Sequence, residues 1–136
     1  MNLEQPQIIQ FPKIMDARGN LSFIQNMDHV PFEIKRTFWI YDVPGGMQRG
    51  GHAYKSEQEV ILALSGSFDV TIINLKGEKF TFCLNRSYFG LYVPPLHWRQ
   101  MDNFSTNAVS MHISSLPFDE RDYIRDLDTF TSMNPS

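Results

Sequence analysis

The sequence predicts an all-β protein, an antiparallel barrel or sandwich with a short helix near the C-terminus. Short apolar runs follow one another with turn signals between them, and the clearest of these runs alternate apolar and polar residues. Helical spacing of apolar residues is found only near the C-terminus. The chain has 136 residues, 42% of them hydrophobic and 20% charged, which favours one folded domain over residues 1–136.

The predicted strands are runs of apolar, β-branched and aromatic residues between turns. They are 7–11, 21–25, 34–43, 59–64, 68–75, 78–84, 90–95, 97–101 and 108–114. Runs 68–75 and 78–84 flank a turn at Lys76-Gly77, which predicts a hairpin. The side chains of this hairpin expected to face the core are Phe68, Val70, Phe80 and Phe82.

The helix is predicted within PFDERDYIRDLDTF, residues 117–130. Tyr123, Ile124, Leu127 and Phe130 recur there at helical spacing, and Asp119 is a suitable N-cap. A helix this short is expected to dock on the sheet or on a partner chain. The tail TSMNPS, 131–136, is expected to be frayed.

Composition argues against several classes of partner and location. The net charge is −3 with no basic stripe, so we expect no nucleic-acid partner. No run of about eighteen apolar residues and no signal-peptide pattern is present, so we expect no membrane partner. The single Cys83 cannot form an internal disulfide, which favours a cytoplasmic protein.

The stretch RGGHAYKSEQE, residues 49–59, concentrates groups that could perform chemistry. His52 could be a metal ligand, a catalytic base or a polar residue on a strand. On an extended strand, His52 and Tyr54 point to the same face, while Ala53 and Lys55 point to the other. An imidazole, with a pKa of about 6.5, takes and returns protons near neutral pH, whereas a phenol, with a pKa of about 10, is a better donor than base.

A second group of candidates follows two prolines, in VPPLHWRQ. The prolines stiffen the approach to His97, Trp98 and Arg99, so these side chains are held in fixed directions. An indole stacks on a base and a guanidinium pairs with phosphate, so Trp98 and Arg99 suit a planar, anionic ligand. Further on, His112 lies inside run 108–114, either as a hydrogen-bonded strand histidine or facing the mouth of the barrel.

The segments RGGHAYKSEQEVILALSGSFDV and GLYVPPLHWRQM resemble the two motifs of a cupin barrel. Together with FPKIMDARGNL, PFEIKRTFWIYDVPGG and DERDYIRDLDTF, they make the chain similar to the nucleotide-sugar 3,4-ketoisomerases nearly end to end. The resemblance implies isomerisation of dTDP-4-keto-6-deoxyglucose through an enediol, in deoxy- and amino-sugar biosynthesis for surface polysaccharide. It also implies a jelly-roll cupin fold, a homodimer, and no metal or organic cofactor.

The resemblance also assigns roles to individual residues. The expected catalytic residues are His52 as the base, with Tyr54 and His97 supporting it. The expected substrate-binding residues are Arg18, Arg36, Arg49, Trp98 and Arg99. The family usually has a second histidine where this chain has Tyr54, and tends to have a tyrosine where it has Phe38.

Two alternatives remain open at the level of sequence. Without the second histidine and the tyrosine, the chain could be a homologue that binds nucleotide sugars and does not catalyse. It could also be a metal-dependent cupin, in which His52, Glu59 and His97 supply three ligands beside an open position.

Overall fold

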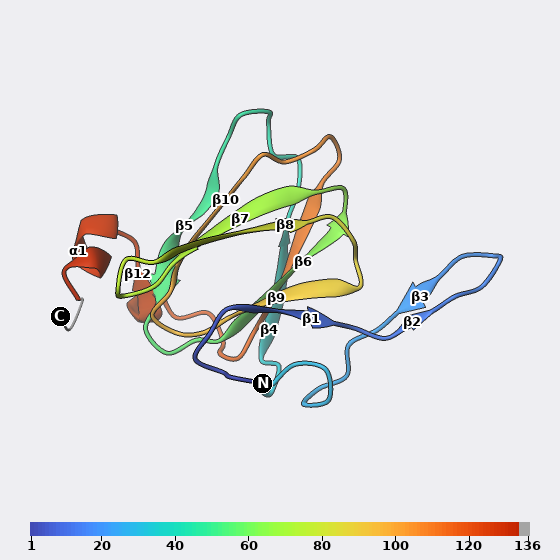
Figure 1. Cartoon of the computed structure of the whole chain (residues 1–136), viewed down its shortest axis with the longest axis horizontal. Helices are drawn as coiled ribbons and strands as arrows, with labels where there is room; N and C mark the ends of the chain where they lie inside the picture. Colours follow the sequence, from blue (N-terminus) through green and yellow to red (C-terminus); the bar gives the residue numbers. More distant parts are fainter. Residues whose placement is uncertain (134–136) are drawn as a thin grey trace.

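The computed structural model describes residues 1–133 as two five-stranded antiparallel sheets with a core between them (Figure 1). The strands are β1 (Gln7–Gln10), β2 (Lys13–Ile14), β3 (Leu21–Ser22), β4 (Arg36–Ile40), β5 (Arg49–Tyr54), β6 (Glu59–Ser65), β7 (Phe68–Ile73), β8 (Lys79–Leu84), β9 (Phe89–Val93), β10 (Trp98–Asp102), β11 (Val109–Ser114) and β12 (Tyr123–Ile124). A 3₁₀ helix, Glu120–Asp122, precedes β12, and α1 (Leu127–Thr131) follows it. The predicted all-β class is confirmed.

One sheet has the strand order β1-β9-β6-β11-β4, and the other has β12-β5-β10-β7-β8. The principal hydrophobic cluster draws Ile61 and Leu91 from the first sheet and Phe68 and Met101 from the second. Strands β2 and β3 pair only with each other, as a hairpin that extends away from the barrel (Figure 1). Within residues 1–133, no helix is long and apolar enough to cross a membrane.

The hairpin expected from 68–75 and 78–84 is confirmed. Strands β7 and β8 pair along their whole lengths, with Val70 opposite Phe82. Phe68 and Val70 are fully buried in the core, and Phe80 and Phe82 pack against it from the edge of the sheet. The alternation of apolar and polar residues therefore set both the pairing and the buried face.

The short helix predicted within 117–130 is confirmed as α1 near the end of that segment, but the expectation that it includes Tyr123 and Ile124 is wrong. Tyr123 and Ile124 form strand β12, which pairs with Tyr54 and Ala53 of β5. A strand sends neighbouring side chains to opposite faces, so Ile124 joins a core cluster while the Tyr123 ring packs on Tyr54. Strand pairing with β5 outweighs the helical spacing of apolar residues in this segment. The sequence pattern of the segment alone does not reveal that pairing.

The acidic residues of this segment cap two separate short helices. Asp119 accepts a hydrogen bond from the backbone N–H of Arg121, at the start of the 3₁₀ helix. Asp126 accepts one from the backbone N–H of Thr129, at the start of α1. The expected N-cap at Asp119 is therefore present, but it begins a three-residue turn. Residues 131–133 are described, and the rest of the tail expected to be frayed, 134–136, lies outside the described residues.

A bulge shapes strand β5 where the candidate residues lie. The pairing of β5 with β10 shifts in register between Arg99 and Met101. Gly50 has a φ of 93° there, and a Cβ at this position would lie 3.1 Å from Cε of Met101. Glycine adopts this conformation without steric cost, so Gly50 permits the bulge that precedes His52.

Candidate active site

A cavity of 390 Å³ opens between the two sheets at the bulge of β5. Its polar lining includes Arg49, His52, Tyr54, Arg99, His112 and Arg125. The lining residues on β5 and β10 belong to one sheet, and His112 on β11 belongs to the other. Tyr123 on β12 and Arg125, just after that strand, line the cavity from the C-terminal segment. We call this space the central cavity.

His52 enters the central cavity from β5, beside two tyrosines. Its ring centroid lies 4.8 Å from that of Tyr54 and 5.0 Å from that of Tyr123. Its Nε2 is buried and has no hydrogen-bond partner among the described residues. Burial, and then the charge of Arg99, lower the pKa of His52 to about 3. The imidazole is therefore neutral at neutral pH, with a nitrogen free to accept a proton or a hydrogen bond.

Tyr54 is completely buried and lies on the same face of β5 as His52, as the alternation predicted. Its hydroxyl donates to the hydroxyl of Tyr123 over 3.3 Å. Burial, followed by the charge of Glu59, raises the pKa of Tyr54 above its usual value. Tyr54 thus remains protonated and acts as a hydrogen-bond donor, not as a base.

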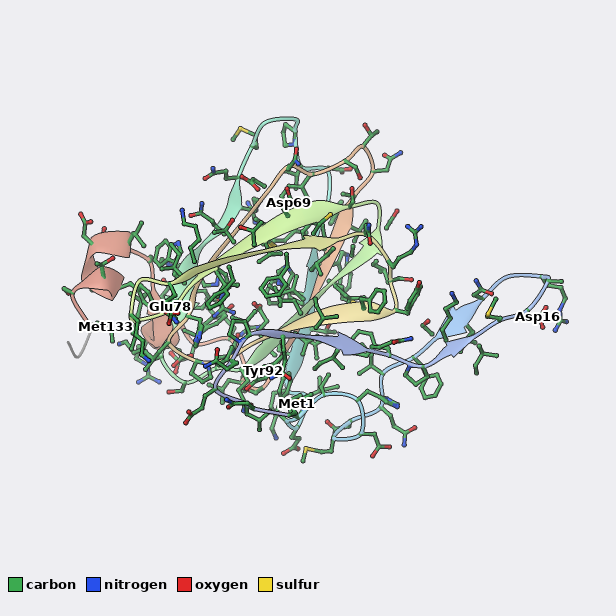
Figure 2. The ribbon with its side chains drawn as sticks, viewed as in Figure 1. Met1, Asp16, Asp69, Glu78, Tyr92 and Met133 are labelled. Atoms are coloured by element: carbon green, nitrogen blue, oxygen red, sulfur yellow. The ribbon has the colours of Figure 1, made fainter. Side chains whose placement is uncertain are left out.

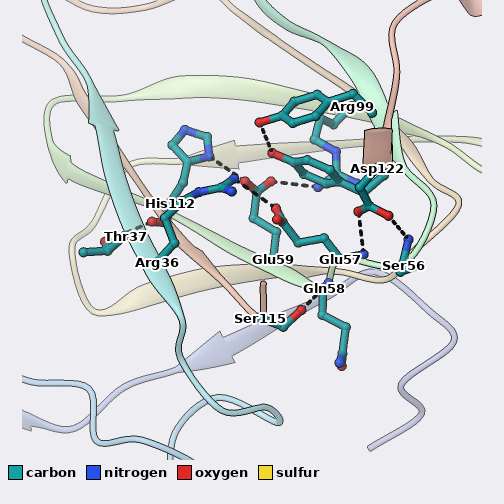
Figure 3. Close-up of polar contacts among 12 residues, drawn as sticks. Arg36, Thr37, Ser56, Glu57, Gln58, Glu59, Arg99, His112, Ser115 and Asp122 are labelled. Atoms are coloured by element: carbon teal, nitrogen blue, oxygen red, sulfur yellow. Dashed lines mark hydrogen bonds and ion pairs between the residues drawn. The ribbon is translucent and has the colours of Figure 1, made fainter. Parts of the chain in front are cut away.

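A buried ionic network joins Arg99, Glu59 and His112 (Figure 3). Nη1 of Arg99 lies 2.7 Å from Oε1 of Glu59, and Nη2 donates to the carbonyl of His97 over 3.0 Å. The guanidinium carbon lies 4.7 Å from the centre of the Tyr54 ring. Arg99 thus presents a fixed positive charge to the central cavity, held by two hydrogen bonds and a stacking contact.

The second oxygen of Glu59 contacts His112. Nδ1 of His112 lies 3.2 Å from Oε2 of Glu59. Burial alone would raise the pKa of the Glu59 carboxyl, but His112 and Arg99 outweigh it and lower this pKa to about 2. Glu59 is therefore an ionised carboxylate that balances the buried charge of Arg99.

His112 lines the central cavity from β11, opposite His52 on β5. Its ring is stacked on Phe38, with centroids 4.5 Å apart and planes inclined by 3°. Its Nε2 lies 3.0 Å from Oγ of Ser110. The sequence left open whether His112 is a hydrogen-bonded strand histidine or faces the mouth of the barrel, and in the structure it is hydrogen-bonded and lines the cavity. The direction of the His112 side chain is predictable from local sequence, because alternation along run 108–114 places residues 110, 112 and 114 on one face.

Four predicted site residues lie outside the central cavity, and two of them are the neighbours His97 and Trp98. Trp98 faces the opposite side of β10, where Ala53, Ile124 and Phe130 bury it. His97 precedes that strand and its Nδ1 hydrogen-bonds with the carbonyl of Pro95 over 2.8 Å. Residues on successive positions of a strand point to opposite faces, so Trp98 and Arg99 could not both enter one cavity.

Arg18 and Arg36 are also placed elsewhere. The Arg18 side chain is 90% exposed and pairs with Asp16 over 2.8 Å, and Asp16 lies at the far end of the β2–β3 hairpin (Figure 2). Arg36 lies over Phe38 and pairs with Glu57 over 3.4 Å, outside the lining of the central cavity. Of the five predicted binding residues, the structure brings Arg49 and Arg99 to the cavity.

The C-terminal segment supplies two cavity residues that the sequence did not single out. Tyr123 and Arg125 both line the central cavity, with the Arg125 guanidinium 4.2 Å from the centre of the Tyr123 ring. Asp122 fixes this segment to the loop after β5, because its carboxylate accepts from the backbone N–H groups of Ser56 and Glu57, each over 3.0 Å. One wall of the site therefore depends on a segment far along the chain.

The metal ligands considered from the sequence do not come together. Within residues 1–133, no group of three or more His, Cys, Asp and Glu side chains is arranged to hold a metal ion. The Glu59 carboxylate is bound by Arg99 and His112, and His97 is hydrogen-bonded outside the cavity. Two residues of the proposed set, Glu59 and His97, thus have other partners.

Two antiparallel sheets around a polar cavity lined by two imidazoles define a cupin-type barrel. A family model described as "FdtA: WxcM-like, C-terminal" matches residues 4–135, and the chain belongs to this family. It is 40% identical over 126 residues to the TDP-4-oxo-6-deoxy-alpha-D-glucose-3,4-oxoisomerase of Aneurinibacillus thermoaerophilus, covering 91% of this chain and 88% of the relative.

Solved structures agree with this assignment. A 3,4-ketoisomerase from Helicobacter canadensis matches with a TM-score of 0.91 and 35% identity, over 96% of this chain and 98% of the other. A mutant of the 3,4-ketoisomerase QdtA from Thermoanaerobacterium thermosaccharolyticum, in complex with TDP-4-keto-6-deoxyglucose, matches with a TM-score of 0.91 and 32% identity. That match covers 95% of this chain and 93% of the other.

Proposed function

We propose that this chain is a cytoplasmic 3,4-ketoisomerase of TDP-linked 4-keto-6-deoxy sugars, with residues 1–136 forming one catalytic domain. The resulting 3-keto sugar would enter deoxy- and amino-sugar biosynthesis for surface polysaccharide. The observation that carries the proposal is the neutral, unpartnered imidazole of His52 inside the central cavity. It is supported by the 40% identity to a curated 3,4-oxoisomerase.

The reaction requires a base that acts on carbon. The C3 hydrogen is acidic because the neighbouring C4 is a ketone, and its removal gives an enediolate. His52 takes this proton and returns it to C4, which makes C3 the ketone. Its low pKa keeps the imidazole unprotonated before substrate binds. General-base catalysis by one side chain is worth about 10² to 10⁴ in rate.

The negative charge that develops on oxygen needs donors and a cation. The rings of Tyr54 and Tyr123 lie beside His52, and their hydroxyls are hydrogen-bonded to each other over 3.3 Å. The guanidinium of Arg99 lies against the Tyr54 ring and strengthens these donors electrostatically. We assign Tyr54 and Tyr123 to stabilisation of the enediolate.

The diphosphate of the substrate needs positive charge at the mouth of the cavity. Arg49 and Arg125 line the central cavity and are both exposed to solvent. A guanidinium binds phosphate through two hydrogen bonds. We therefore propose Arg49 as the diphosphate contact of a single chain, in place of Arg18 and Arg36, and Arg125 as a second contact once phosphate displaces Glu120, which pairs with Arg125 over 2.6 Å.

We further propose that the enzyme is a homodimer. The outer face of the sheet containing β4, β6 and β11 carries Trp39, Leu64 and Met111, and an apolar hollow of 520 Å³ lies among them. Trp39 is 57% exposed and Leu64 is 53% exposed, which is unusual for large apolar groups on one patch. Trp39→Ser is expected to shift the protein toward monomer in light scattering. A monomer already in the wild type would contradict the proposal.

The function is tested with dTDP-4-keto-6-deoxyglucose in deuterated water, followed by NMR. Wild-type protein should exchange the C3 hydrogen and form the 3-keto product. His52→Asn should lower turnover by about 10² to 10⁴ with little change in dTDP affinity. If wild-type protein binds dTDP without exchange or product, the role is binding alone.

A further inference from the structure

Ketoisomerisation moves two hydrogens, and the base proposed above, His52, moves one of them. His52 carries a hydrogen from C3 to C4. The second hydrogen begins on the C3 hydroxyl and ends on the C4 hydroxyl, so the oxygens need their own acid and base. Tyr54 is poorly suited to that exchange, because burial raises its pKa and its proton is not readily released.

The structure places a second imidazole on the opposite wall of the central cavity. His52 comes from β5 of one sheet and His112 from β11 of the other, and both rings line the same cavity. A sugar ring held between the sheets would have one imidazole on each side. The stacking of His112 on Phe38, together with hydrogen bonds at both ring nitrogens, fixes its orientation.

Glu59 determines which nitrogen of His112 faces the reaction. The Glu59 carboxylate lies 3.2 Å from Nδ1 and keeps a hydrogen there. Proton exchange then occurs at Nε2, whose partner in the free protein is Oγ of Ser110, 3.0 Å away. Arg99 holds the other carboxylate oxygen over 2.7 Å, so Glu59 stays ionised while the charge on the ring changes.

On the basis of the proposed function, we propose that His112, oriented by Glu59, is a second catalytic residue that carries the oxygen-bound proton. As His52 takes the C3 proton, the C3–H electrons form the C3=C4 bond and the C4 carbonyl π electrons move to its oxygen. That oxygen takes a proton from Nε2 of protonated His112, which gives a neutral enediol.

The second half of the reaction reverses both roles. Nε2 of the neutral His112 takes the proton of the C3 hydroxyl, and the C3 carbonyl forms. The C3=C4 electrons take the proton held by His52, which makes the new C4–H bond. Both imidazoles return to their starting states, and no oxidant, reductant or co-reactant is consumed.

The test compares two rates in one NMR experiment with dTDP-4-keto-6-deoxyglucose in deuterated water. One is deuterium exchange at C3 of the remaining substrate, and the other is formation of the 3-keto product. In His112→Gln the enediolate still forms and returns to substrate, because His52, Tyr54 and Tyr123 are intact. Product formation should therefore fall at least about tenfold more than C3 exchange, within the usual worth of an acid–base group.

The ratio of the two rates does not depend on how much of a variant folds. His52→Asn should lose exchange and product together, and His29→Gln, a matched change in a loop outside the cavity, should leave the ratio unchanged. Ser110→Ala removes only the partner of Nε2 and serves if His112→Gln is insoluble. It should raise the ratio of exchange to product by a smaller factor.

Two results would overturn the inference, and they are distinguishable. Equal losses of exchange and product in His112→Gln, or an unchanged ratio in Ser110→Ala when the first variant is insoluble, would leave His112 as a structural residue of a working isomerase. Absence of both exchange and product in the wild type would overturn the proposed function, and the role of His112 with it.

Discussion

Replacing Glu59 by glutamine is expected to destabilise the fold by about 3–5 kcal/mol. The Glu59 and Arg99 side chains are each 1% exposed and their charges lie 2.7 Å apart. Among residues 1–133, Glu59 is the one carboxylate that forms an ion pair with Arg99. Glutamine keeps the shape of the side chain but leaves the guanidinium buried without a counter-charge, and removal of one partner of a buried pair costs about that amount.

The lowered pKa of Glu59 gives a second value for the stability that the Glu59 carboxylate contributes. The folded protein lowers this pKa from 4.5 to about 2, and a difference of that size corresponds to about 3 kcal/mol of stability at neutral pH. Because the folded pKa lies below the ordinary one, this stability is present above 4.5 and is lost as the pH falls toward 2. Glu59→Gln lacks this dependence.

The measurement is urea unfolding of the wild type and Glu59→Gln at neutral pH and at several lower values. The difference in unfolding free energy should be about 3–5 kcal/mol at neutral pH and should narrow as the pH falls from about 5 to 3. A loss below about 1 kcal/mol, or a difference that does not change with pH, would refute the reasoning. Glu4→Gln, the same loss of one negative charge at an exposed position, controls for net charge.

Three further predictions follow from the same region. Gly50→Ala should lower the unfolding free energy by about 1–2 kcal/mol in chemical denaturation, because the φ of 93° is unfavourable for alanine and its Cβ would meet Met101; no loss would mean the bulge relaxes freely. Burial raises the pKa of Glu57 to about 7, so its contribution to stability is present below about 4.5 and is lost as the pH rises toward 7. Glu57→Gln should therefore gain stability relative to the wild type between about pH 5 and 8, and a constant difference in unfolding free energy would contradict this. Turnover should persist after EDTA treatment, since Glu59 is bound to its ion-pair partners and Tyr54 stays protonated; loss of activity that added metal restores would establish a metal site.

Local pattern in the sequence was sufficient for much of the fold and for the centre of the site. Alternation at a period of two predicted the hairpin of 68–75 with 78–84 and its buried face. The same rule placed His52 and Tyr54 on one face of their strand, opposite Ala53. These features depend on residues one or two positions apart, where backbone geometry alone fixes the direction of side chains.

The tertiary structure decided which candidates meet. Arg99 lies 40 positions from Glu59 in the chain, and His112 lies 53 positions from it. Pairing between strands of the two sheets brings these residues into contact. Pairing with β5 places Tyr123 and Ile124 in a strand. Trp98 packs against Phe130 and therefore lies outside the central cavity. Hydrogen bonding between distant strands and burial in a shared core are non-local interactions, so the spacing of residues along one segment does not encode them.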